Sequence, residues 1–184
     1  MRLSCFHVAP KISLNIITQT LDSIHVFYEK LYKLRPFSFE FTDKTFEKIS
    51  IEIYTDSLKY IYGFNLKEKR LNDTLRKYNL DVEQTRHVAG LMQSIHCTWV
   101  NNLDYYVAKN QHLLTFMSIR PRAFYFPFTN KKYYIITYFS QPQYFDKNGI
   151  LFDNRRQRQM RRINNDVFRR INDKVAYTIS DRFR

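Results

Sequence analysis

The stretch PFSFEFTDKTFEKISIEIY, from Pro36 to Tyr54, decides the fold that we expect for this chain. Phenylalanine alternates with polar residues over FSFEF (37–41), and isoleucine alternates with polar residues over ISIEI (49–53). A two-residue period is typical of strands that bury one face. We therefore predict two strands here, each with one apolar side.

Upstream of this stretch, KISLNIITQ (11–19) is rich in β-branched residues and predicts a strand. Thr20 and Asp22 offer helix-start chemistry, and apolar residues follow them at helical spacing. We expect a helix that ends near Leu34, because Arg35-Pro36 interrupts the pattern.

Downstream, LKYIY (58–62) fits a strand or a helix, whereas 67–78 predicts a basic helix. Asp81 is a candidate N-cap for a longer helix, and Asn101-Asn102 separates that helix from another one. These two helices would form an antiparallel pair that ends before residue 120.

The strand pattern returns in AFYFPF (123–128) and YYIITYF (133–139), and Asn148-Gly149 predicts a tight turn. Asp153 then opens a basic helix. Its apolar stripe consists of Met160, Ile163, Val167, Phe168, Ile171 and Val175.

Together these elements predict an α+β fold, a single mixed domain of strands and packed helices with a basic C-terminal helical extension. We place the domain at residues 1–152, with a candidate sub-boundary near residue 80, and the Arg-rich extension at 153–184. The sequence shows no internal repeat and no Gly/Ser linker.

The charge balance points to a polyanionic partner. The 184 residues contain 30 Lys and Arg against 17 Asp and Glu, a formal net charge of +13. Each phosphate that Lys or Arg neutralises releases a condensed counterion, so nucleic acid is the first candidate and an anionic membrane the second. No apolar run approaches the roughly 18 residues of a membrane-spanning helix, so we expect no transmembrane segment.

Residue usage indicates an AT-rich gene. Phe (16), Tyr (14), Ile (16), Asn (13) and Lys (14) have AT-rich codons and are abundant, whereas Gly occurs 3 times. Arginine persists at 16 copies, which favours selection for its bidentate phosphate fork, although codon drift is the alternative. The N-terminus lacks a secretory pattern and a clear transit peptide. An organelle genome is the simplest source.

Basic residues in four places are the candidate RNA contacts. The strongest group lies on the predicted final helix, where packed arginines repel one another unless a polyanion neutralises them; a solvated helix face is the alternative. A second group flanks aromatic residues that suit stacked bases, although aromatics alternating in a strand are usually core. The candidates are Lys44, Lys48, Lys67, Lys69, Arg70, Arg120, Arg122, Lys131, Lys132, Arg155, Arg156, Arg158, Arg161, Arg162, Arg169 and Arg170.

Metal binding and catalysis find little support in the sequence. Cys5, His7, His96 and Cys97 are ligand types that zinc accepts, but they lack the usual close spacing, so inert thiols and ordinary histidines are the preferred interpretation. Neither a phosphate-binding Gly-rich loop nor a G-x-S-x-G elbow occurs. The acidic pairs Glu40/Asp43 and Glu47/Glu52 fit solvent-facing strand residues. We expect no enzyme activity, no cofactor and no small-molecule substrate.

VAGLMQSIH (88–96) loosely resembles the helix motif of the LAGLIDADG homing endonucleases, at about four positions. Ile95 stands where that family has its metal-binding acid, so the resemblance implies at most an inactive remnant.

As a whole, the chain resembles a divergent ribosomal protein encoded in a protist mitochondrial genome, as in ciliates. The layout of Ile12 to Tyr54 is similar to ribosomal small-subunit protein ten, which implies RNA contact by a basic loop near Lys44 to Lys48. We therefore expect a constituent of the mitochondrial ribosome in the matrix, bound to ribosomal RNA and neighbouring ribosomal proteins. The alternatives are a matrix-side accessory subunit of a respiratory complex, held by anionic lipid or protein neighbours, and the inactive nuclease or maturase remnant.

Overall fold

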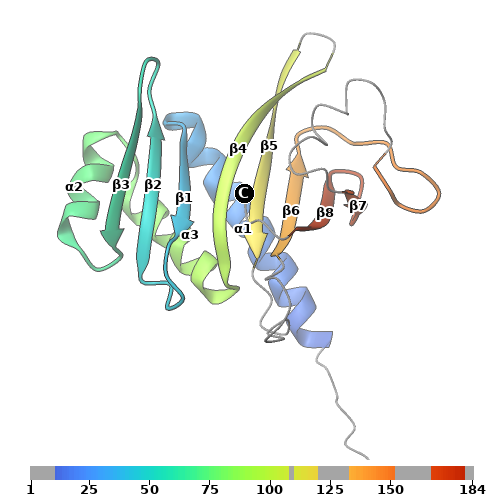
Figure 1. Ribbon diagram of the computed structural model, residues 1–184, viewed down its shortest axis with the longest axis horizontal. Helices are drawn as coiled ribbons and strands as arrows, with labels where there is room; N and C mark the ends of the chain where they lie inside the picture. Colours follow the sequence, from blue (N-terminus) through green and yellow to red (C-terminus); the bar gives the residue numbers. More distant parts are fainter. Residues whose placement is uncertain (1–10, 108–109, 120–132, 152–166, 181–184) are drawn as a thin grey trace, which may run out of the picture.

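In the computed structural model, eight antiparallel strands of the described residues form one sheet in the order β3-β2-β1-β4-β5-β6-β8-β7 (Figure 1). The structure describes residues 11–107, 110–119, 133–151 and 167–180. The elements are α1 (Lys11–Leu34), β1 (Phe37–Phe41), β2 (Lys48–Tyr54), β3 (Lys59–Asn65), α2 (Lys69–Lys77), α3 (Val82–Ser94), β4 (Cys97–Val107), β5 (Asn110–Ile119), β6 (Tyr133–Phe139), β7 (Arg169–Arg170) and β8 (Val175–Ser180). The predicted α+β fold is confirmed.

The two predicted alternating strands are β1 and β2. Phe39 pairs with Ile51, and their neighbours two residues away on each strand pair in the same register, so all of these side chains lie on one face. That face packs against helix residues such as Ile24, Tyr28 and Met92, which are fully buried. The ambiguous segment after residue 56 is the strand β3, which continues the same sheet.

The predicted strand at 11–19 is wrong, because this segment is the first part of the single helix α1. Ile17, Leu21, Ile24 and Tyr28 follow one another at intervals of three or four residues, and all pack on the main core. The helical period therefore extends upstream of Thr20 to Ile17, where tertiary packing overrides β propensity.

The second predicted helix of the antiparallel pair is also wrong. Residues 97–107 and 110–119 form the β4–β5 hairpin, with Val100 paired to Met117 and Leu103 to Leu114. Val100 and Met117 belong to the helix-side core, whereas Trp99 and Leu114 belong to a second apolar cluster. Because apolar residues lie on both faces of these strands, they do not alternate with polar residues along the sequence. Their spacing therefore fitted a helical period.

The predicted C-terminal helix is wrong where the structure describes it, from residue 167 to residue 180. Arg169 and Arg170 form β7, and Val175 begins β8, which pairs with β6. Val167 and Ile171, two members of the expected apolar stripe, are 47% and 50% exposed. In β8, which pairs with β6, the buried residues are Val175, Ala176, Thr178 and Ser180. The remainder of the expected helix, 152–166, lies outside the described residues, as does AFYFPF (123–128).

Other local predictions are confirmed. The strand at 133–139 is β6, and Gly149 adopts a positive φ of 72° in the turn after Asn148. The Asp146 carboxylate accepts hydrogen bonds from the amides of Asn148 and Ile150, both at 2.8 Å. The basic helix expected at 67–78 is α2.

Asp81 is the N-cap of α3, as predicted, and its side chain accepts a hydrogen bond of 2.9 Å from the Gln84 amide. We expect Asp81→Ala to lower the free energy of unfolding by about 1 kcal/mol, because a helix amide loses its partner. Urea denaturation followed by circular dichroism measures this change. The exposed Asp56, in the β2–β3 turn, supplies the control Asp56→Ala; equal losses in both variants would contradict a capping role.

Candidate nucleic-acid interface

The turn between β1 and β2 is rigidly built, and it presents two of the predicted RNA contacts. The Asp43 carboxylate accepts hydrogen bonds from the amides of Glu47 and Lys48, at 3.0 and 2.9 Å, and another from the Thr45 hydroxyl. Desolvation opposes ionisation of Asp43, but these hydrogen bonds together outweigh it and lower the pKa of the carboxyl. Lys44 and Lys48 remain exposed on either side of this frame.

Phe46 anchors the same turn to α3. This residue adopts a positive φ of 58°, and its buried ring packs against Phe41 and against His96, with centroid distances of 5.0 and 5.2 Å. The Gln93 side chain donates a hydrogen bond of 2.6 Å to the Phe46 carbonyl. The lysines of the turn are therefore displayed from a fixed support.

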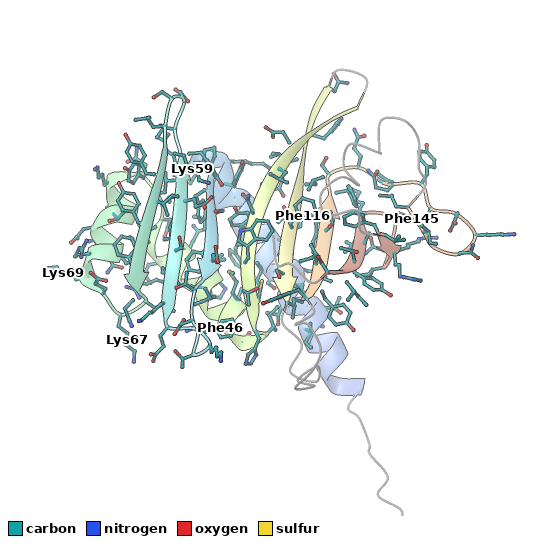
Figure 2. The ribbon with its side chains drawn as sticks, in the orientation of Figure 1. Phe46, Lys59, Lys67, Lys69, Phe116 and Phe145 are labelled. Atoms are coloured by element: carbon teal, nitrogen blue, oxygen red, sulfur yellow. The ribbon has the colours of Figure 1, made fainter. Side chains whose placement is uncertain are left out.

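The connection from β3 to α2 lies at the same end of the sheet, because Lys48 pairs with Asn65 across the two strands. The Leu66 amide donates to the Glu47 carbonyl at 2.8 Å, and the Lys67 amide donates to the Asn65 side chain at 3.0 Å. Arg86 of α3 donates to the Leu66 carbonyl at 2.9 Å. Figure 2 shows Lys67, Lys69 and Phe46 near this lower end of the sheet.

Five of the predicted contacts thus share one end of the molecule, and we call them the basic end cluster. All five side chains are exposed: Lys44, Lys48, Lys67, Lys69 and Arg70. Three acidic residues lie among them. The Asp43 carboxylate accepts hydrogen bonds from amides of the turn, Glu68 forms an ion pair with Arg70 at 3.2 Å, and Glu47 is exposed. The four lysines are available for phosphate oxygens, which accept charge-assisted hydrogen bonds from ammonium groups.

Arg169 and Arg170 do not join this cluster. They form β7 at one edge of the sheet, whereas β3 forms the other edge, so seven strand intervals separate them, on the order of 30 Å. Arg170 forms an ion pair with Asp173, and its guanidinium lies 5.8 Å from the centre of the Phe145 ring. The other candidates lie outside the described residues: Arg120, Arg122, Lys131, Lys132, Arg155, Arg156, Arg158, Arg161 and Arg162.

Three basic residues that the sequence did not single out lie at the opposite end of β3. Lys59 forms an ion pair of 2.7 Å with Glu52 of β2. Lys77, with Arg76 beside it in the last turn of α2, lies 5.4 Å from the centre of the Tyr78 ring, and that ring contacts Tyr60. Basic residues in the last turn of a helix interact favourably with the negative end of the helix dipole. Arg76 and Lys77 fit this sequence pattern, by which they can be identified.

The structure shows the surroundings of several candidate acidic and metal-binding residues. Glu52 is held by Lys59 and by the Tyr54 hydroxyl, which donates to it at 3.0 Å, and Glu47 is exposed in the β1–β2 turn. Within the described ranges, no three His, Cys, Asp or Glu side chains are grouped to hold a metal ion. Cys5 and His7 lie outside these ranges. VAGLMQSIH (88–96) spans the end of α3, with Ile95 as its C-cap.

Cys97 is fully buried, and burial raises the pKa of its thiol from 9.0 to about 12. Because the pKa of the Cys97 thiol is higher in the folded chain than in the unfolded chain, the thiol contributes to stability below about pH 9. This contribution is lost as the pH rises from 9 towards 12. We therefore expect that Cys97, in a Cys5→Ser background, does not react with Ellman's reagent at about pH 8 until urea unfolds the chain. Rapid reaction of the folded protein would contradict this expectation.

Comparison of the chain with protein families, curated proteins and solved structures gives no match. In the part of the chain that the structure describes, none of the helices has the length and apolar character needed to cross a membrane.

Proposed function

We propose that this chain is a non-catalytic RNA-binding protein and a structural constituent of a mitochondrial ribosome. The observation that carries the proposal is the basic end cluster, five exposed cations in or next to the hydrogen-bonded β1–β2 and β3–α2 connections at one end of the sheet. The net charge of +13 and the AT-rich residue usage support it.

The mechanism follows from the geometry of the cluster. Lysines on a fixed support neutralise phosphates without paying the full ordering entropy of a flexible loop. Contacts of this kind position a protein on RNA and carry little sequence information. The protein therefore acts by holding RNA segments in place, and its arginines outside the described residues add further phosphate contacts.

We do not include the resemblance to ribosomal small-subunit protein ten in this proposal. It relied on a strand at the start of Ile12 to Leu34, and this segment lies within one helix.

A salt titration tests the RNA proposal. We expect the affinity of the full chain for a fluorescently labelled RNA hairpin to fall with salt, with a slope of log K against log salt of about −4 or steeper. Anisotropy measurements give this slope. A slope near zero would contradict binding through phosphates.

Vesicles provide the discriminating arm of the same experiment. If phosphatidylcholine vesicles with added cardiolipin compete fully with the RNA at equal phosphate concentration, the accessory subunit of a respiratory complex replaces the ribosomal proposal. We expect the RNA to remain bound.

A further inference from the structure

β3 is an edge strand whose outer backbone groups lack the protection that edge strands usually carry. It has seven residues, KYIYGFN, and it pairs with β2 along its whole length without a register shift. Proline, bulges and inward charges normally prevent such an edge from pairing further. β3 has none of these and a single lysine at its first position.

The alternation of hydrogen-bonded pairs in the β2–β3 hairpin shows which backbone N–H and C=O groups of β3 point away from the sheet. The Thr55 amide donates to the Leu58 carbonyl, and the Leu66 amide donates to the Glu47 carbonyl. Because hydrogen-bonded and non-hydrogen-bonded pairs alternate in an antiparallel hairpin, Tyr60, Tyr62 and Phe64 bond to β2. Lys59, Ile61 and Gly63 therefore direct their N–H and C=O groups away from the sheet.

The side chains along this edge are apolar and accessible. Leu58, Tyr60 and Ile61 are 57%, 36% and 63% exposed, and they are consecutive or nearly so in the chain. A Cβ atom on Gly63 would meet only the Ile49 carbonyl oxygen, at 4.0 Å, so the backbone there is open to close approach. In Figure 1, α2 extends to the outer side of β3, behind the position that a further strand would take.

The charged side chains near the two ends of β3 indicate which kind of strand fits its edge. The basic end cluster lies at one end of β3, and Lys59 lies at the other (Figure 2). The charges at the Lys59 end are balanced, because Glu52 pairs with Lys59, Asp73 pairs with Arg76, and the exposed Asp56 lies in the β2–β3 turn. A second copy of this chain in antiparallel pairing would bring its charge-balanced Lys59 end onto the basic end cluster, which then has no acidic complement. RNA has no extended row of alternating donors and acceptors to match a strand edge. A protein strand with Asp or Glu at the end that meets the basic end cluster satisfies both constraints.

We propose that the β3 edge binds an extended, acidic segment of a partner protein, which adds a ninth strand to the sheet. Its backbone pairs with Lys59, Ile61 and Gly63, its inner side chains rest on α2 and Tyr60, and its acidic end meets the lysines of the basic end cluster. This proposal does not depend on RNA binding.

A designed peptide tests the proposal with the full chain. The peptide has about eight residues, the length that spans β3, with valine in alternate central positions and Glu at both ends, and its binding is followed by fluorescence anisotropy. Ile61→Pro removes the central outward N–H and leaves the β2–β3 bonds intact, as proline is tolerated at strand edges. We expect at least a 10-fold loss of peptide affinity for Ile61→Pro.

Controls distinguish the effect of the Ile61 backbone N–H from that of its side chain, and peptide binding from RNA binding. Ile61→Thr keeps the N–H and should lose less than about 3-fold in affinity, and a peptide with Lys in place of Glu should not bind. RNA affinity should be the same for Ile61→Pro and the unmodified chain. Circular dichroism checks that both variants are folded.

Three results would overturn the proposal. The first is no binding of the acidic peptide at about 1 mM, the weak end of the affinity scale. The second is a dimer in sedimentation equilibrium that Ile61→Pro dissociates, which would make a second copy the occupant. The third is loss of RNA affinity in folded Ile61→Pro, which would assign the edge to RNA.

Discussion

Phe39→Ala lowers the free energy of unfolding by about 3 to 5 kcal/mol, the range for truncating a large buried ring. Phe39 is 1% exposed and lies on β1, between β2 and β4. Its ring meets Phe41 edge-on at 5.5 Å, on the face that α1 covers. A cavity at this position cannot collapse, because strands on both sides and helix residues above hold its walls apart.

Chemical denaturation followed by tyrosine fluorescence and circular dichroism measures this loss. Tyr144→Ala is the matched control, since Tyr144 is an aromatic residue that is 80% exposed, and its replacement should change the free energy of unfolding by less than about 0.5 kcal/mol. A loss below about 1 kcal/mol for Phe39→Ala would show that β1 is not the centre of the core.

The second large effect concerns RNA. Replacing Lys44, Lys48, Lys67 and Lys69 together by alanine should reduce RNA affinity by 10² to 10³-fold, an order-of-magnitude value for four phosphate contacts near physiological salt. The slope of log K against log salt should become less negative by about 3. These lysines are exposed and are not needed for packing, so the variant should fold normally.

A charge-matched control tests whether position matters. The exposed lysines Lys30, Lys33, Lys147 and Lys174 lie elsewhere on the described surface, and their replacement by alanine leaves the same net charge. We expect this control to lose less than about 10-fold in affinity. Equal losses in the two variants would mean that RNA responds to total charge alone, and the basic end cluster would have no special role.

The sequence predicted the parts of the fold in which one face of an element is buried. FSFEF (37–41) and ISIEI (49–53) alternate because the helices cover only one side of β1 and β2. The prediction failed at β4 and β5, where Trp99 packs on one face and Val100 on the other. It also failed before Thr20, where Ile17 has high β propensity but packs on the core from a helix.

The candidate interface was predicted only in part, for a related reason. The sequence marked Lys44 and Lys48 as loop residues and Lys67 to Arg70 as a basic segment, but it could not bring the two segments together. Their proximity depends on the pairing of Lys48 with Asn65, a contact that only the register of β2 and β3 defines. The same register exposes the outer edge of β3, which composition and motifs do not indicate.

The most direct test of the ribosomal proposal is sedimentation of a mitochondrial lysate through a sucrose gradient, with and without ribonuclease, while mass spectrometry follows this chain. We predict that the chain travels with a ribosomal subunit and that ribonuclease releases it. If it instead remains with detergent-solubilised membrane complexes and is unaffected by ribonuclease, the ribosomal proposal is wrong.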